Sequence, residues 1–234
     1  MRTKSIVTLL AFLSALFLSA CSTVAVPPPE DKEAEQRTVA GKKIAVEGKI
    51  SLDRNVYIVS DGSGSMGGGD CRGDKENNIA AAKWATKKFV ETSVPTDVNL
   101  GLFAFDSRGI SERVPIGKNN RQNILQEIDK LNSGGGTPLN ESIAAGVDAL
   151  RLQRAKQLGY GWFTLLVVTD GEAPTETGVA YASRFAIPIV TIGFCLDKTH
   201  PLAVHSISYR DARNPDELFV AFQEVLAESE TFTK

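Results

Sequence analysis

The chain contains few of the residues that most catalytic and soft-metal sites require. Among its 234 residues there are two histidines, His200 and His205, and three cysteines. Both histidines lie in loop-like stretches, so we expect structural roles for them rather than catalysis. The chain also lacks an excess of positive charge, because 26 Lys and Arg residues face 28 Asp and Glu residues. This balance argues against nucleic-acid binding and against electrostatic binding to anionic lipid.

Long apolar runs are absent apart from one at the N-terminus. Two basic residues precede the apolar stretch 6–18, and small residues follow it. This arrangement is typical of a secretory signal peptide, here residues 1–20, and the stretch is too short for a membrane-spanning helix. The residues Leu-Ser-Ala before Cys21 resemble the lipobox of bacterial lipoproteins. The resemblance implies cleavage before Cys21 and attachment of lipid to that cysteine.

The resemblance to lipoproteins also implies a location. A chain that begins at Cys21 has 214 residues (234 minus 20), and its formal charge changes from −2 to −4 because two basic residues are lost. Ser22 stands where an aspartate would favour retention in the inner membrane of Gram-negative bacteria. We therefore expect the bacterial cell envelope, and within it the outer membrane. An ordinary secreted protein with an unmodified Cys21 is the alternative.

Composition divides the rest of the chain into a tether and one domain. Residues 21–41 contain three consecutive prolines followed by charged residues, which is typical of a flexible, solvated tether. Residues 42–52 alternate loosely through Ile44, Val46 and Ile50, and they predict an extra edge strand or a packed arm. We expect a single domain over residues 42–234 that starts with this arm.

Apolar runs and helical periodicity alternate along this domain. Continuous apolar runs predict buried strands, and apolar residues three or four positions apart predict helices between them. The alternation predicts an α/β fold with a doubly wound, mostly parallel six-stranded sheet flanked by helices, similar to a Rossmann fold. The expected strands are 56–59, 98–105, 110–114, 163–168, 187–194 and 206–209, and the expected helices lie around 79–89, 124–131, 139–150, 179–185 and 218–225.

A glycine-rich turn follows the first expected strand directly. Asp61, Ser63 and Ser65 in this turn place one carboxylate and two hydroxyls at the carboxyl edge of the sheet, where α/β folds bind ligands. Two distant segments supply similar groups, because Thr137 follows three glycines and Asp170 ends a later apolar strand. Taken alone, the first cluster is also explained as an ordinary turn, and Thr137 before a proline as a helix N-cap.

These segments, in this order, resemble the metal-ion-dependent adhesion site (MIDAS) of von Willebrand factor A (VWA) domains. The resemblance extends over residues 53–228 and fills all five positions of the site. It implies a divalent cation that keeps one coordination place open for a carboxylate of a partner protein, and hence a binding module rather than an enzyme. The implied metal ligands are Asp61, Ser63, Ser65, Thr137 and Asp170.

The donor atoms point to a hard cation independently of the resemblance. Carboxylate and hydroxyl oxygens without His or Cys favour Mg²⁺, and also Mn²⁺ or Ca²⁺, over Zn²⁺ or Cu²⁺. Mg²⁺ gives up its water reluctantly, so we expect one exchangeable water among its ligands. A correctly folded domain that binds no cation is the alternative.

Cys71 and Cys195 follow two different expected strands, so both should lie on the metal-binding face. An exported protein permits oxidation, and we expect a disulfide between them. Two free thiols are one alternative. A zinc site that also uses Asp197 and His200 is another, although its ligand spacing resembles no common pattern.

Three functions fit these features. The first is a lipid-anchored, divalent-cation-dependent protein-binding module, for adhesion or assembly, that engages an acidic residue of its partner. The second is an envelope scaffold component whose metal site is secondary. The third is a metal-dependent hydrolase, which lacks both a recognisable general base and a second metal cluster.

Overall fold

The strands expected from the sequence form one sheet. The computed structural model describes residues 48–171, 173–196 and 199–231, and all of them belong to one compact unit. The strand order is β3-β2-β1-β4-β5-β6, and of these strands only β3 runs antiparallel to its neighbour. The predicted fold class is therefore confirmed. The strands are β1 (Arg54–Asp61), β2 (Asn99–Asp106), β3 (Gly109–Gly117), β4 (Trp162–Thr169), β5 (Ile189–Phe194) and β6 (Ser208–Ala212).

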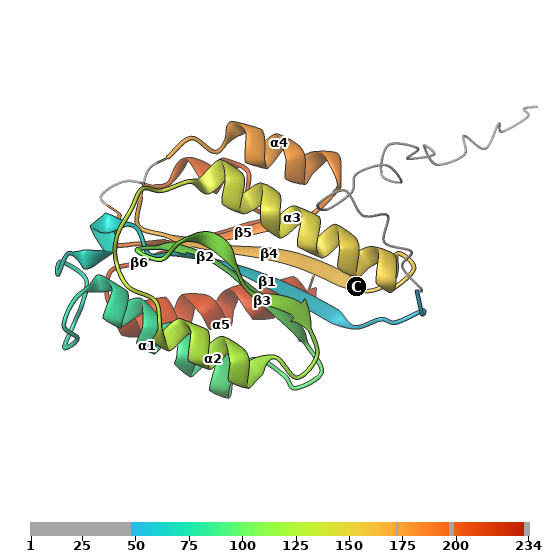
Figure 1. Ribbon diagram of the computed structural model, residues 1–234, viewed down its shortest axis with the longest axis horizontal. Coiled ribbons are helices and arrows are strands. Elements are labelled where there is room, and N and C mark those ends of the chain that lie inside the picture. The colour runs from blue at the N-terminus through green and yellow to red at the C-terminus, as the bar shows by residue number, and fades with distance from the viewer. Residues whose placement is uncertain (1–47, 172, 197–198, 232–234) are drawn as a thin grey trace, which may run out of the picture. The chain divides into compact units, whose positions relative to one another are not determined.

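Helices cover both faces of the sheet, as Figure 1 shows. Each face has its own buried apolar cluster, because side chains alternate between the two sides of each strand. Ile58 packs on one side and its neighbour Val59 on the other. One face is covered by α1 (Asn78–Thr92), α2 (Arg121–Asp129) and α5 (Pro215–Thr231), and the other by α3 (Leu139–Lys156) and α4 (Glu176–Arg184).

Two contacts show how the helices are fixed. Phe89 of α1 stacks on Phe222 of α5 with ring centroids 4.8 Å apart, and both rings are buried. On the opposite face, Gly146 lets α3 approach β4, because a Cβ atom at this position would lie 2.4 Å from Leu165 Cδ1. These packed helices hold the strands, and therefore the loops at the strand ends, in fixed positions.

The expected edge strand before β1 is wrong for the residues that the structure describes. Residues 48–53 have no strand pairing, while residues 42–47 lie outside the described part. The Lys49 N–H donates to the Lys156 carbonyl (2.8 Å), and the Gln157 side chain donates to the carbonyls of Ser51 and Asp53. These bonds satisfy backbone groups that a strand would have paired, so the segment is a packed arm instead.

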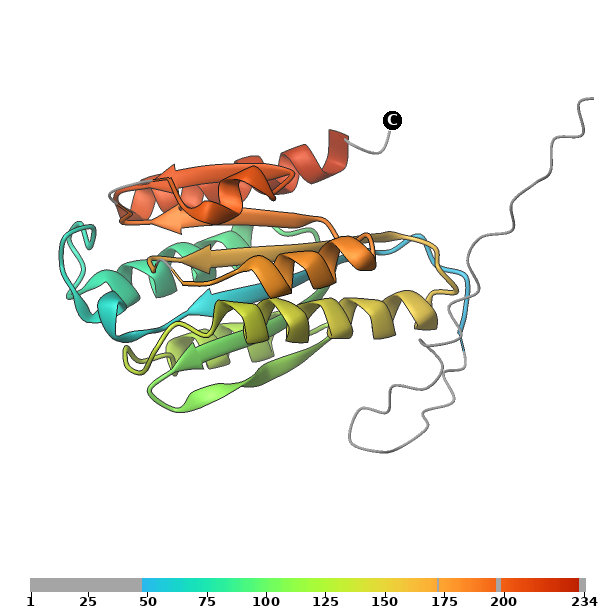
Figure 2. The ribbon, with the colours of Figure 1, turned by 90° about the horizontal axis from the view of Figure 1, so that it is seen from above.

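The parallel strands give the domain two different ends. Their carboxyl ends share one edge of the sheet, which we call the carboxyl edge. Their amino ends, with residues 48–53 and the C-terminal end of α3, lie at the opposite end, which we call the amino pole (Figure 2). No described helix is long and apolar enough to cross a membrane. The predicted signal peptide, Cys21 and the tether lie outside the described residues.

Candidate metal site

Asp61 ends β1 with its carboxylate fixed from two sides. The backbone N–H of Ser63 donates to Oδ1 (2.8 Å), and the hydroxyl of Thr169 donates to Oδ2 (2.6 Å). β1 and β4 are parallel neighbours in which Ser60 pairs with Val168, so the next residues, Asp61 and Thr169, emerge side by side. Asp61 is 2% exposed, and its two hydrogen bonds fix the orientation of the carboxylate at the carboxyl edge.

Asp170 lies one residue beyond β4 and meets both serines of the glycine-rich turn. The Ser65 hydroxyl donates to Asp170 Oδ1 (2.7 Å), and the Ser63 hydroxyl lies 3.4 Å from the same oxygen. The two serine hydroxyls are 2.9 Å apart. The structure thus brings together Asp61, Ser63, Ser65 and Asp170, which the sequence separates by more than 100 residues.

The loop that carries Thr137 is bonded to the serine turn through its backbone. The N–H of Gly64 donates to the carbonyl of Gly135 (3.0 Å), and the N–H of Gly134 donates to the carbonyl of Gly62 (2.9 Å). Gly135 has φ of +84°, a backbone conformation that L side chains rarely adopt. The glycines therefore allow the close approach that the sequence suggested.

Thr137 faces the residue that follows Asp170. A Cβ atom added at Gly171 would lie 3.1 Å from Thr137 Oγ1, so the threonine packs directly against this turn. The N-cap of α3 is Pro138, and among the described residues the Thr137 hydroxyl accepts no capping hydrogen bond from a backbone N–H of the helix. Its hydroxyl makes no hydrogen bond to another described residue. The capping alternative for Thr137 is therefore wrong, and its oxygen remains available to a ligand.

The two carboxylates carry an uncompensated charge. Burial and, secondly, the negative charge of Asp61 raise the pKa of Asp170 to about 6. Burial also raises the pKa of Asp61, although hydrogen bonds from Ser63 and Thr169 act in the opposite direction. In the part of the chain that the structure describes, neither carboxylate forms an ion pair with Lys or Arg. A cation at this place would relieve the repulsion between them.

The donor set fits a hard divalent cation. Two carboxylates and three hydroxyls are oxygen ligands of the kind that Mg²⁺, Mn²⁺ and Ca²⁺ accept. Among the described residues, no three His, Cys, Asp or Glu side chains converge as a zinc site would require. The chemistry of the donor set is therefore compatible with a hard cation.

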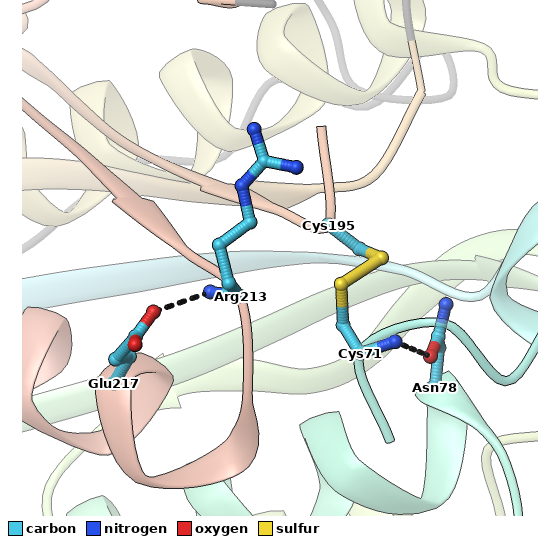
Figure 3. Close-up of a disulfide and its surroundings, with 5 residues drawn as sticks. All are labelled: Cys71, Asn78, Cys195, Arg213 and Glu217. Atoms are coloured by element: carbon cyan, nitrogen blue, oxygen red, sulfur yellow. Dashed lines mark hydrogen bonds between the residues drawn. A yellow bond between two sulfur atoms is a disulfide. The ribbon is translucent and has the colours of Figure 1, made fainter. Parts of the chain in front are cut away.

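A disulfide joins two loops of the carboxyl edge, as Figure 3 shows. Cys71 and Cys195 are bonded with a Cα–Cα distance of 5.5 Å and a sequence separation of 124. Asn78 at the start of α1 accepts from the Cys71 N–H (3.1 Å), and the Cys195 N–H donates to the Ala212 carbonyl (2.8 Å). The predicted disulfide is confirmed, and the free-thiol and zinc alternatives for these cysteines are wrong.

Two buried residues near the site were not predicted to contribute. Thr169 orients Asp61, as described above. His200 is 1% exposed, accepts from the Leu202 N–H at Nδ1 (3.0 Å), and its Nε2 lies 3.0 Å from the Gly171 carbonyl. His200 thus contacts the backbone of the turn that follows Asp170. Thr169 interrupts the apolar run next to Asp170 and could have been suspected, whereas nothing in the sequence placed His200 there.

Of the five candidate ligands, Thr137 also lines a cavity of about 580 Å³. Thr137 and its glycines form one wall, and the β2–β3 turn with Asp106 and Ile110 forms another. Asp106 is buried but neutralised by ion pairs with Arg108 (3.0 Å) and Arg113 (2.9 Å). These ion pairs make Asp106 unavailable to a cation.

The sequence matches a known family over the region that contains the site. Residues 56–172, which are 117 of 234, match the family model of the von Willebrand factor type A domain. The chain therefore belongs to the VWA family, whose domains are usually binding modules without catalytic activity. No curated protein sequence matches the chain.

Solved structures of three distant proteins share the fold. An aerotolerance-related membrane protein from Bacteroides fragilis has a TM-score of 0.59 at 17% identity, with 76% of this chain and 99% of that chain covered. The pilus adhesin SpaC from Lactobacillus rhamnosus has a TM-score of 0.58 at 16% identity, with 79% and 31% covered. The manganese-loaded TRAP protein of Plasmodium vivax has a TM-score of 0.52 at 14% identity, with 75% and 74% covered. At these identities the likeness concerns the fold alone.

Proposed function

We propose that this protein is a lipid-anchored, divalent-cation-dependent protein-binding module for adhesion or assembly, and that its MIDAS engages a carboxylate of a partner protein. The observation that carries the proposal is the convergence of Asp61, Ser63, Ser65 and Asp170 in one hydrogen-bonded cluster beside Thr137. Two proteins with the same fold support the proposal: one is a pilus adhesin, and the other, TRAP, was solved with manganese bound.

The five candidate ligands contribute in two ways: the aspartates supply charge, and the hydroxyl residues supply neutral oxygens. Asp61 and Asp170 supply two negative charges, which only just balance a dication, so a cation with one open coordination place would remain electrophilic towards a further carboxylate. Ser63, Ser65 and Thr137 supply neutral oxygens and fix the shape of the site. A bound Mg²⁺, Mn²⁺ or Ca²⁺ would supply the positive charge that attracts a partner carboxylate.

The cavity beside Thr137 gives the partner a surface to contact. Ile110, near the start of β3, is 54% exposed, and Pro174 also lines the cavity. Glu141, at the start of α3, adds an acidic group to the wall. We expect the partner to present one acidic residue next to apolar ones, because a second acidic residue would meet Glu141.

We further propose that Cys21 carries the lipid and that the domain is held at the bacterial cell envelope, on the outer membrane, by the tether 21–41. The lipobox resemblance motivates this proposal. Replacing Cys21 with Ser should block lipid attachment and leave the precursor or a soluble product. An intact mass of membrane-extracted protein that shows an unmodified Cys21 would contradict it.

Calorimetric titration with Mg²⁺ tests the site, and capture of envelope proteins with Mg²⁺ or with chelator tests the binding function. We expect Asp61→Ala and Ser65→Ala to lose Mg²⁺ binding and cation-dependent capture. Asp70→Ala is the matched control, because Asp70 is an exposed carboxylate in the same turn region. Capture that persists undiminished in chelator would refute the metal-bridged function and favour the scaffold role.

A further inference from the structure

Exposed apolar side chains gather at the amino pole, away from the candidate metal site. Nine large apolar residues are exposed in the described structure, and five of them lie in two short segments, 48–53 and 158–162. A soluble surface normally scatters such residues singly, so this concentration indicates a contact surface. We call it the pole patch; it consists of Ile50 (61% exposed), Leu52 (64%), Leu158 (52%), Tyr160 (50%) and Trp162 (42%).

The pole patch is held by hydrogen bonds between its two segments. The Gln157 side chain is 3% exposed and donates to the carbonyls of Ser51 (3.1 Å), Asp53 (3.3 Å) and Tyr160 (3.1 Å). The Trp162 N–H donates to the Asp53 carbonyl (3.3 Å). Because the backbone is satisfied in this way, the exposed side chains are presented by a fixed framework.

Positive charge borders the pole patch, in contrast to the slightly acidic chain as a whole. Lys49 and Lys156 are exposed and are joined to each other through a backbone hydrogen bond (2.8 Å). The nearby Asp53 is neutralised by an ion pair with Lys118 (2.8 Å). The pole therefore combines aromatic and aliphatic side chains with lysines, a combination suited to the interface between water and an anionic lipid surface.

We propose that the pole patch docks on the surface of the lipid bilayer. The described domain begins at Gly48, within the patch region, and Cys21 lies 27 residues before it. Composition predicts a flexible tether over residues 21–41, and a flexible chain of 27 residues spans on the order of 30 Å, so a lipid on Cys21 would keep the patch within reach of the bilayer. The docking rests on the proposed lipid anchor. It would turn the carboxyl edge, with its metal site, away from the membrane and towards a partner.

The two tryptophans of the chain allow a direct test of the docking. The mature, lipidated protein carrying Trp84→Phe has Trp162 as its one tryptophan. It is incorporated into vesicles of phosphatidylethanolamine and phosphatidylglycerol with brominated acyl chains. We expect quenching of Trp162 emission and a shift to shorter wavelength. The matched control is Trp162→Phe, in which Trp84, half-buried on α1 between Lys75 and Lys88, should remain unquenched.

A second measurement separates docking from anchoring. The mature-length chain with Cys21→Ser carries no lipid, and it should still bind these vesicles weakly. Adding Leu52→Asp and Tyr160→Asp should abolish this binding, whereas Val204→Asp, at an 82% exposed residue outside the pole patch, should leave it unchanged. Mg²⁺ affinity should be the same in all of these variants.

Three results would overturn the proposal. Trp162 could remain unquenched by brominated lipid. Its emission could already be blue-shifted without vesicles, which would show that another part of the chain covers the pole patch. Sedimentation could show a dimer that Tyr160→Asp dissociates, which would make a second copy the occupant. Each of these outcomes leaves cation-dependent partner capture intact, so failure of the docking is distinguishable from failure of the proposed function.

Discussion

At the scale of single residues, the carboxylates of Asp61 and Asp170 repel each other when no cation is bound. Asp61 is buried and Asp170 is half-buried, and neither forms an ion pair with Lys or Arg in the described structure. The serine and threonine hydroxyls only partly offset the cost of burying the two charges. A cation removes the repulsion, and so does loss of one charge, but only the cation creates a place for a partner carboxylate.

Asp170→Asn should therefore have opposite effects on metal binding and on stability. We expect Mg²⁺ affinity to fall at least about tenfold, because a contact to a charged group is worth about 1.5–3 kcal/mol. The metal-free variant should melt at a higher temperature than the metal-free wild type at pH 8. Calorimetric titration and thermal melts in chelator measure the two effects.

The stability gain of Asp170→Asn should depend on pH in one direction. The pKa of Asp170 in the folded protein is raised from 3.8 to about 6, so wild-type folding becomes less favourable as the pH rises between these values. The penalty is complete above pH 6 and absent well below pH 4. The difference in melting temperature should therefore shrink as the pH is lowered from 8 to 4. A difference that is independent of pH would contradict this origin.

Thr169→Val should weaken the metal site while preserving the fold. The substitution keeps the shape of the side chain and removes the 2.6 Å hydrogen bond that orients Asp61. We expect roughly a tenfold loss of Mg²⁺ affinity, the size of one hydrogen bond to a charged group. Thr164→Val, at a buried position in the same strand, is the matched control. Equal affinity in both variants would show that Thr169 plays no part in positioning Asp61.

At the scale of elements, the loops of the carboxyl edge are connected to one another by hydrogen bonds and by the disulfide. The serine turn is bonded to the glycine loop before α3, and the loop after it is bonded to the end of β5 through the disulfide. The loop after β4 is bonded to the side chain of His200 through the Gly171 carbonyl. Segments from across the sequence thus converge at one edge, because the parallel strands β1, β4 and β5 end on the same side of the sheet.

Removing the disulfide should destabilise the domain and loosen the site. Cys71→Ala with Cys195→Ala should cost about 2–4 kcal/mol in the free energy of unfolding, because the link no longer restricts the unfolded chain. Chemical denaturation of the double variant checks the value. Cys21→Ser is the control and should leave the denaturation midpoint unchanged. An unchanged midpoint in the double variant would show that the disulfide adds no stability.

At the scale of the whole molecule, the two ends of the sheet carry different surfaces. The carboxyl edge presents oxygen ligands and a cavity, whereas the amino pole presents apolar and basic side chains. The rigid sheet between them keeps the two surfaces apart. A domain of this design can contact a bilayer at one end and a partner protein at the other.

Binding of the cation should stabilise the whole fold. A ligand that binds only the folded state adds about 2.7 kcal/mol at a concentration one hundred times its dissociation constant. We therefore expect the melting temperature of the wild type to rise steadily with Mg²⁺ concentration. The rise should disappear in Asp61→Ala. Potassium chloride of equal ionic strength is the control, and an equal rise in both salts would point to screening instead of specific binding.

The sequence by itself determined the order and type of the elements and the composition of the candidate site. The apolar run 165–168 and the spacing of Ile79, Ala82 and Phe89 predict a strand and a helix because burial requires those periods. Asp61 and Asp170 could be placed at one edge because both follow parallel strands. The same argument predicted the disulfide between Cys71 and Cys195.

Only the tertiary structure decided what depends on contacts between distant residues. The sequence pattern did not distinguish an arm from an edge strand at 48–53, since this choice depends on the hydrogen bonds that Gln157 makes across the amino pole. Nor could periodicity show that Thr169 orients Asp61 or that His200 supports the turn after Asp170. The pole patch likewise arises from two segments about 100 residues apart. Such contacts depend on how whole elements pack, so they cannot be predicted from the local sequence.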